Sequence, residues 1–176
     1  MKKVSKHIRR LRQKPKHVLD ASVLFGGHDL DLEESERKDC ESYLGAMGKK
    51  YNGFITIPVL GEVTWAIASK CDDNAIREKA ILYVLNLIRS KQISTIPIKK
   101  GQDEHINDIH KIDSRITYDD ALHLSNTIAA EHQNFITLDR ALVSPDASQT
   151  RYNLKQKFKL DIQHPKDVIS DLDIRS

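Results

Sequence analysis

Short apolar stretches alternate with longer amphipathic stretches along the chain. Buried strands are predicted where apolar or β-branched residues cluster, at 17–19, 54–57, 93–98 and 134–138. Apolar residues at helical spacing predict helices between them, over 31–50, 58–70, 73–88, 101–112 and from 117 onward. The C-terminal part predicts one more strand at 159–162 and a helix at 165–172. This alternation is typical of an α/β fold whose mostly parallel sheet is covered by helices on both faces.

Particular residues mark the beginnings of these helices. Pro58 directly follows the second strand and suits the first turn of a helix, where its missing N–H costs nothing. Thr117 opens a Thr-Tyr-Asp-Asp sequence that has the capping-box spacing in its acidic form. The helix after Asp73 carries an apolar stripe. The residues of that stripe are Ile76, Ala80, Ile81, Val84, Leu85 and Ile88.

The composition fits one globular domain. The chain has 176 residues, of which 39% are hydrophobic and 30% charged, and this length suffices to bury a full core. No apolar run approaches the roughly 20 residues that cross a bilayer, and the charged N-terminus lacks the apolar stretch of a secretory signal. Cys40 and Cys71 have no metal-binding spacing, so free thiols in a reducing cytoplasm are expected.

Positive charge is concentrated at the N-terminus. Eight of the 28 basic residues lie within 1–17, where there is no acidic residue. The rest of the chain therefore has 20 basic against 25 acidic residues, a net charge of −5. We predict a basic extension over residues 1–16 that contacts nucleic acid through phosphate neutralisation. The alternative is a solvated extension without a specific partner.

Four acidic residues stand where strands end or helices begin. Asp20 and Asp139 each follow a short apolar strand, and Glu62 lies in the first turns of the helix that leaves the second strand. Asp120 lies in the first turn of the helix that starts near Thr117. Because the carboxyl ends of parallel strands share one edge, where ligands bind, we expect these four acids to converge.

Each acid also has a purely structural explanation. Asp120 can favour the start of its helix through the helix dipole, Asp139 can cap a short helix, and Glu62 can be a solvated residue. Asp20 is the hardest to explain in this way, because it stands between apolar stretches where an unpaired buried charge is costly.

Carboxylates that converge repel one another unless a cation lies between them. Mg²⁺ and Mn²⁺ are hard divalent ions that prefer oxygen ligands and keep several waters. The characteristic chemistry of such a site is phosphodiester hydrolysis, in which the ion activates a water molecule. The four acids therefore predict a metal-dependent nuclease.

The sequences around these acids resemble the four acidic motifs of PIN domains. The matching segments are Val18-Leu19-Asp20-Ala21-Ser22-Val23, Pro58-Val59-Leu60-Gly61-Glu62-Val63, Tyr118-Asp119-Asp120-Ala121-Leu122-His123-Leu124 and Ile136-Thr137-Leu138-Asp139. Each motif alone is weak, but the four occur in the family's order over roughly residues 16–145. Within the family, the chain looks most like the VapC-type toxins, which are single-domain ribonucleases.

The resemblance implies a three-layer α/β/α PIN-like fold over residues 17–176. It also implies an Mg²⁺- or Mn²⁺-dependent endoribonuclease whose metal ligands and catalytic residues are Asp20, Glu62, Asp120 and Asp139. Ser22 and Thr137 occupy places where a hydroxyl supports the metal ligands, and Asp119 remains an alternative ligand. The implied partners are RNA, a cognate antitoxin and a second copy of the chain in a homodimer.

Two departures from typical VapC chains keep other functions open. The chain carries the basic extension before its first strand, and the stretch 144–157 is unfamiliar. One alternative is a housekeeping PIN nuclease that processes ribosomal or transfer RNA, for which the basic extension would dock on a folded RNA. Another is a non-catalytic RNA-binding PIN domain, although this chain keeps all four acids.

Three further residues lie near the motifs. His123 follows Asp120 by three positions, and packing on the apolar helix face or a local hydrogen bond is expected for it in preference to catalysis. Arg115 and Arg140 flank the third and fourth acids. Either guanidinium could hold a phosphate with two hydrogen bonds or serve only as surface charge.

Overall fold

A five-stranded parallel sheet forms the centre of the computed structural model, which describes residues 14–26 and 32–173. The strands are β1 (Lys16–Leu19), β2 (Asn52–Thr56), β3 (Ser94–Ile96), β4 (Asn134–Ile136) and β5 (Asp161–Gln163). Their order across the sheet is β3-β2-β1-β4-β5, and every paired neighbour is parallel. The predicted α/β class with a mostly parallel sheet is confirmed.

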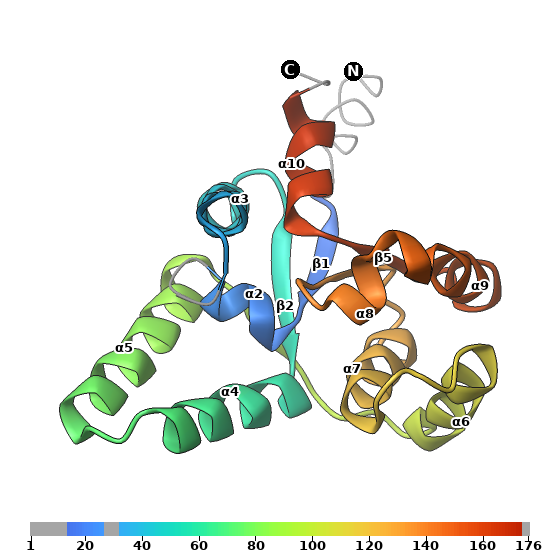
Figure 1. Ribbon diagram of the computed structural model, residues 1–176, viewed down its shortest axis with the longest axis horizontal. Helices are drawn as coiled ribbons and strands as arrows, with labels where there is room; N and C mark the ends of the chain where they lie inside the picture. Colours follow the sequence, from blue (N-terminus) through green and yellow to red (C-terminus); the bar gives the residue numbers. More distant parts are fainter. Residues whose placement is uncertain (1–13, 27–31, 174–176) are drawn as a thin grey trace, which may run out of the picture.

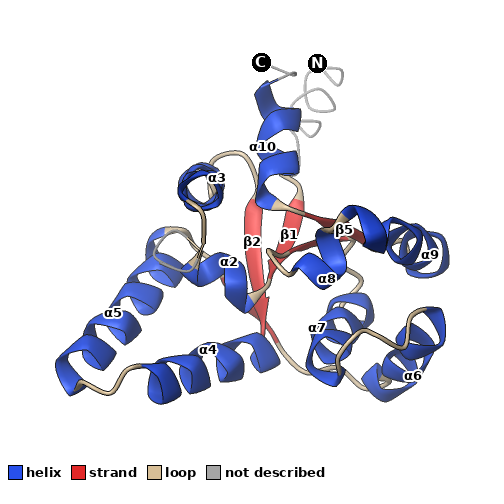
Figure 2. Ribbon diagram, viewed as in Figure 1, coloured by secondary structure: helices blue, strands red, loops and turns tan. Residues whose placement is uncertain are grey.

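Helices cover both faces of this sheet (Figures 1 and 2). They are α2 (Ala21–Phe25), α3 (Glu34–Ala46), α4 (Ile57–Lys70), α5 (Asn74–Ser90), α6 (Gln102–Ile112), α7 (Tyr118–Ala129), α8 (Arg140–Val143), α9 (Ser148–Phe158) and α10 (Pro165–Asp173), with the short 3₁₀ helix η1 (Pro145–Ala147). Successive residues of a strand point to opposite faces. Accordingly Leu19 packs with α2, α3, α4 and α5, whereas Val18 packs with α6, α7 and α9. The arrangement is the three-layer α/β/α fold that the resemblance implied.

Capping residues fix where the helices near the sheet edge begin. The Thr56 hydroxyl accepts a hydrogen bond from the N–H of Val59, and Pro58 occupies the first turn of α4. The Thr117 hydroxyl accepts one from the N–H of Asp120 at the start of α7. Side-chain oxygens of this kind satisfy N–H groups that have no partner within the helix. Both predicted helix starts are therefore confirmed to within a residue.

The chain changes direction across the sheet between β1 and β4. From β1 it moves outward through β2 and β3 on one side, then returns through α6 and α7 to β4 and β5 on the other. Asp20, directly after β1, donates its backbone N–H to the carbonyl of Ile136 in β4 (2.9 Å). The ends of β1 and β4 thus lie side by side at a topological switch point, where open α/β sheets bind their ligands.

Several elements differ from the prediction. Half of the apolar stripe of α5 is uncovered, because Ile76, Ile81 and Leu85 are exposed. Val84 is buried, and Ala80 and Ile88 are partly buried against the core. The helix α9 occupies most of the unfamiliar stretch 144–157 and was not predicted, nor was the short helix α2. The short helix α8 had been raised only as the helix that Asp139 could cap.

Part of the prediction lies outside the described residues. The predicted extension over 1–16 falls there largely, and so does the first residue of the helix predicted over 31–50. Cys40 and Cys71 are both free, as expected. Among the described residues, no helix is both long enough and apolar enough to span a membrane.

Candidate metal centre

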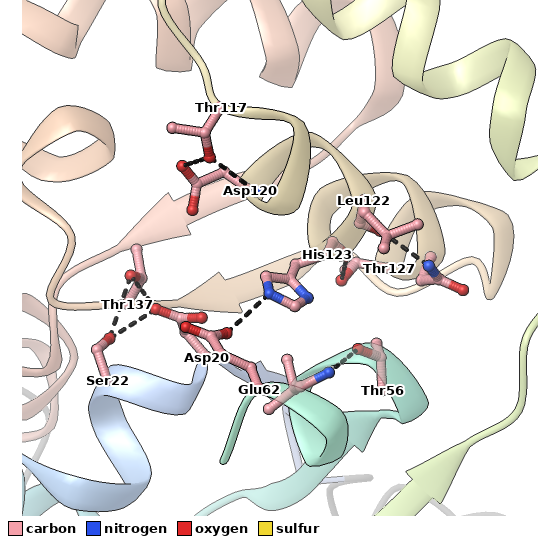
Figure 3. Close-up of polar contacts among 12 residues, drawn as sticks. Asp20, Ser22, Thr56, Glu62, Thr117, Asp120, Leu122, His123, Thr127 and Thr137 are labelled. Atoms are coloured by element: carbon pink, nitrogen blue, oxygen red, sulfur yellow. Dashed lines mark hydrogen bonds and ion pairs between the residues drawn. The ribbon is translucent and has the colours of Figure 1, made fainter. Parts of the chain in front are cut away.

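Asp20 is the buried carboxylate of the site at the switch point. Its side chain is buried, with 7% of the residue exposed. One carboxylate oxygen, Oδ2, accepts hydrogen bonds from the Ser22 hydroxyl (2.6 Å) and the Thr137 hydroxyl (2.7 Å), as Figure 3 shows. Burial raises the pKa of Asp20, although these two hydrogen bonds act to lower it. The fold therefore holds a carboxylate where its charge is costly and fixes it from two sides.

Glu62 reaches Asp20 from α4, and His123 reaches both from α7. The Nε2 atom of His123 lies 2.9 Å from Oε2 of Glu62, and each residue offers one donor atom within 4.8 Å of the others'. The Glu62 side chain is 46% exposed, whereas that of His123 is 5% exposed. The two side chains thus lie beside Asp20, with the histidine buried in the core and the carboxylate of Glu62 in contact with solvent.

Electrostatic interactions link His123 to the surrounding acids. Burial alone would lower the pKa of His123. The hydrogen bond to Glu62 and the negative charges of Asp20, Glu62 and Asp120 outweigh burial, so the pKa is raised. The histidine therefore lies in a distinctly negative environment.

Asp120 and Asp139 lie around this group without joining it. Asp120 accepts a hydrogen bond from the Thr117 hydroxyl (2.5 Å), and burial raises its pKa. The charges of Asp139 and Asp20 raise that pKa further. Asp139 caps α8, because its Oδ1 accepts the N–H of Ala141 (3.0 Å). The capping role given for Asp139 is therefore confirmed, and Asp120 lies in the first turn of α7 as expected. Neither position excludes a second role.

The donor set fits a small divalent ion. Asp20, Glu62 and His123 form the group with metal-binding spacing that the described residues contain. Asp20 and Glu62 supply two carboxylates there, and a small hard ion such as Mg²⁺ is usually bound through one or two carboxylates while it keeps several waters. Burial is the main cause that raises the pKa values of Asp20 and Asp120, so a bound cation would favour the ionised form of both. Asp119 is exposed and lies outside the group.

The two flanking arginines have different surroundings. Arg115 donates from Nε and Nη2 to the two carboxylate oxygens of Asp113 (3.0 and 2.8 Å), so this edge of its guanidinium is already paired. Arg140 is exposed, and its nearest acidic partner, Glu36, is 3.7 Å away. Of the two, Arg140 has the guanidinium that is less engaged.

His123 is the residue that the sequence analysis undervalued. A local hydrogen bond or packing on the helix face was expected, yet its ring bonds to a carboxylate 61 positions away. Its spacing of three from Asp120 places both residues on one face of α7, and this was the available signal. The sequence did not predict that Glu62 contacts this face of α7, because that contact depends on how α4 packs against α7.

The strand order and the acid-lined switch point together define an α/β protein with a carboxylate site between β1 and β4. The family model of the PIN domain matches residues 17–147, most of the chain. The chain therefore belongs to the PIN-domain family, and the predicted family is confirmed. No curated protein sequence matches the chain significantly.

Solved structures share this fold at low sequence identity. A chain of VapBC2 from Rickettsia felis, bound to a DNA fragment from its promoter, matches with a TM-score of 0.56 and 13% identity. That match covers 85% of this chain and 98% of the other. A chain of FitAcB from Neisseria gonorrhoeae matches with a TM-score of 0.58, 10% identity and coverages of 85% and 97%. At these identities the likeness concerns the fold.

Proposed function

We propose that this chain is an Mg²⁺- or Mn²⁺-dependent endoribonuclease. The observation that carries the proposal is the meeting of Asp20 and Glu62 with His123 at the switch point, with Asp120 and Asp139 alongside. Membership of the PIN-domain family supports the same assignment. We assign the ion-holding and catalytic roles to Asp20, Glu62, Asp120 and Asp139.

These side chains have separable roles in the proposed reaction. Asp20, held by two hydroxyls, provides a fixed ligand, and Glu62 provides a second one from α4. A divalent ion bound there would activate a water molecule for attack on an RNA phosphodiester. Asp120 and Asp139 add negative charge on the side of α7 and α8. That charge repels the RNA backbone unless a cation is bound, so substrate binding and metal binding should depend on each other.

RNA cleavage by the purified chain tests this proposal. Total cellular RNA is incubated with the wild type and with Asp20→Asn, in Mg²⁺, in Mn²⁺ and in EDTA. We expect cleavage by the wild type with either ion and loss of cleavage in EDTA and in the variant. The control variant is Thr127→Val, which should keep the cleavage activity. Thr127 is also buried, but its hydroxyl donates to a backbone carbonyl and not to a carboxylate of the site. Cleavage that survives both EDTA and Asp20→Asn would refute the proposed mechanism.

We further propose that the chain is the cytoplasmic toxin of a VapBC-type toxin–antitoxin pair and forms a homodimer. Its structural neighbours are complexes named VapBC2 and FitAB, solved with DNA. Exposed apolar side chains on two helices also offer a surface to which such partners could bind. Of the nine exposed large hydrophobic residues of the described chain, six lie on α4 and α5, and exposed apolar side chains mark protein contacts. They are Ile57, Trp65, Ile76, Ile81, Leu82 and Leu85.

The toxin role is tested in cells and on the gene. A small DNA-binding protein encoded directly upstream would be the candidate antitoxin. Expression of the chain should arrest growth, Asp20→Asn should abolish the arrest, and co-expression of the upstream protein should relieve it. Wild-type expression without any arrest would contradict the toxin role and leave the nuclease proposal standing.

The basic residues 1–16 favour one alternative, a nuclease that processes structured RNA. Lysine and arginine there would add affinity for phosphates, with a strong dependence on salt and little sequence preference. Deletion of residues 1–16 measures this contribution. RNA affinity that is unchanged at low salt would remove the extension from RNA binding.

A further inference from the structure

The carboxylates of the site differ in what holds them. Asp20 is held by two hydroxyl groups, Asp120 by the hydroxyl that caps its helix, and Asp139 by a backbone N–H of its own helix. Glu62 is held by the ring of His123, and this is the one hydrogen-bond partner that the described residues give it. Figure 3 shows the histidine reaching from α7 toward the carboxylates of Glu62 and Asp20.

The chemistry of the two groups gives the direction of this bond. A carboxylate only accepts hydrogen bonds, so Nε2 of His123 carries the hydrogen and donates it to Oε2 of Glu62. The other ring nitrogen, Nδ1, is buried and has no partner among the described residues. A histidine that binds a metal ion normally donates its other N–H to an acceptor, which fixes the ring. Since Nδ1 has no acceptor here, His123 fits a hydrogen-bond donor better than a metal ligand.

The length and the exposure of the Glu62 side chain give that donor a purpose. Glutamate has a long side chain with several rotatable bonds, and nearly half of the Glu62 side chain is exposed to solvent. His123 on α7, in contrast, is buried in the core. A buried donor can hold the flexible carboxylate beside Asp20 before any ion arrives, so less freedom is lost on binding.

We propose that His123 is a positioning residue, whose Nε2–H holds the Glu62 carboxylate beside Asp20 as a preformed half of the divalent-ion site. This role rests on the proposed metal-dependent function. It concerns binding of the ion, so it can be measured without RNA and without turnover.

Mn²⁺ binding by the metal-free protein tests the proposal, with calorimetry for the affinity and the Mn²⁺ spin resonance signal as a second readout. His123→Leu removes the donor at similar volume and should weaken Mn²⁺ binding about 10–100-fold, the usual cost of losing a group that orients a metal ligand. His123→Gln places an amide N–H near the position of Nε2 and should recover most of the affinity. In a Glu62→Ala background, His123→Leu should cause no further loss, because the residue through which it acts is absent.

Controls separate positioning from a general structural effect. His132 packs against Phe54, and its Nδ1 is likewise buried without a partner, so His132→Leu should leave Mn²⁺ affinity unchanged. Melting temperatures of all variants report folding. Should His123→Leu fail to fold, His123→Asn, whose amide is too short to reach Glu62, replaces it.

Each contrary result has a distinct meaning. Wild-type affinity in His123→Leu would overturn the positioning role alone. Two results would make His123 a direct ligand of the ion and would also overturn the positioning role. One is that His123→Leu lowers Mn²⁺ affinity in the Glu62→Ala background as much as it does in the wild type. The other is a nitrogen coupling to bound Mn²⁺ in electron spin echo spectra. Failure of the wild type to bind Mn²⁺ would overturn both this inference and the proposed metal-dependent function.

Discussion

Replacing Thr137 by valine tests how the fold supports the buried charge of Asp20. Thr137 is fully buried, and its hydroxyl has two close partners besides a longer contact of 3.5 Å with the Ser22 hydroxyl. It donates to Oδ2 of Asp20 (2.7 Å) and accepts the backbone N–H of Asp139 (2.9 Å). Valine keeps the branched shape and removes both hydrogen bonds, so the variant isolates the contribution of one oxygen atom.

The magnitude follows from what each bond contributes. A hydrogen bond to a charged group is worth roughly 1.5–3 kcal/mol, and a buried N–H without a partner costs about 1–3 kcal/mol. Asp139 is only partly buried, so water can replace part of its lost acceptor. We therefore expect Thr137→Val to lower the free energy of unfolding by about 2–4 kcal/mol at neutral pH.

The loss should depend on pH with a defined sign. The pKa of Asp20 is raised mainly by burial, and the Thr137 hydrogen bond acts against this rise by stabilising the ionised form. Without that bond the folded-state pKa rises further. The destabilisation is therefore largest above the pKa of Asp20 and shrinks as the pH falls below it.

Urea unfolding of the metal-free protein measures both effects, in EDTA at neutral pH and at the lowest pH at which the variants fold. Thr127→Val is the matched control, because Thr127 is equally buried but donates to the uncharged carbonyl of His123 (2.9 Å). Thr127→Val should lower the free energy of unfolding by about 0.5–1.5 kcal/mol, independently of pH. Equal losses for the two variants, with no pH dependence in Thr137→Val, would refute the reasoning.

Four further predictions concern the acids and the exposed helix α4. Mn²⁺ at 100 times its dissociation constant should stabilise the wild type by about 2.7 kcal/mol but not Asp20→Asn, as followed by melting temperature. Without metal, Asp20→Asn should melt above the wild type at neutral pH, because the raised pKa of Asp20 makes its ionised form unfavourable; a lower melting temperature would contradict this. Asp113→Asn should cost about 1–2 kcal/mol at neutral pH by weakening the bond from Thr150 (2.6 Å). Since the pKa of Asp113 is lowered, chiefly by its hydrogen bond from Arg115, that cost should fade as the pH falls through the range where the carboxyl is protonated, and a constant cost in acid titrations would contradict it. Trp65→Ser on exposed α4 should change stability by less than about 0.5 kcal/mol while weakening self-association or antitoxin binding, measured by sedimentation and calorimetry; unchanged association would remove Trp65 from the contact.

The sequence predicted the strands and the placement of the acids because both depend on local patterns. Val18 and Leu19 form a short apolar run that ends at an acid, and the carboxyl ends of parallel strands meet at one edge. Thr117 and Pro58 mark helix starts by rules that involve only the next few residues. The order of the motifs gave the family resemblance, and the family match confirms the family.

Features that depend on packing between distant elements were not predictable. The bond between His123 and Glu62 requires α4 and α7 to approach each other, and no local pattern reports that distance. The stripe of α5 has the spacing of a core-facing helix, yet the neighbouring elements cover only part of it, and Leu85 is left exposed. Helix α9 is mostly polar, with Thr150 and Leu154 as its buried residues, so its apolar signal was too weak to recognise.

We propose that Asp20 and Glu62 hold a divalent ion at the junction of β1 and β4. Anomalous diffraction from a crystal grown with Mn²⁺ tests this most directly, because it locates the ion without assuming any activity. We expect a strong anomalous peak between the carboxylates of Asp20 and Glu62, on the side that faces Asp120 and Asp139. A Mn²⁺ peak elsewhere on the protein, with none at these carboxylates, would contradict it.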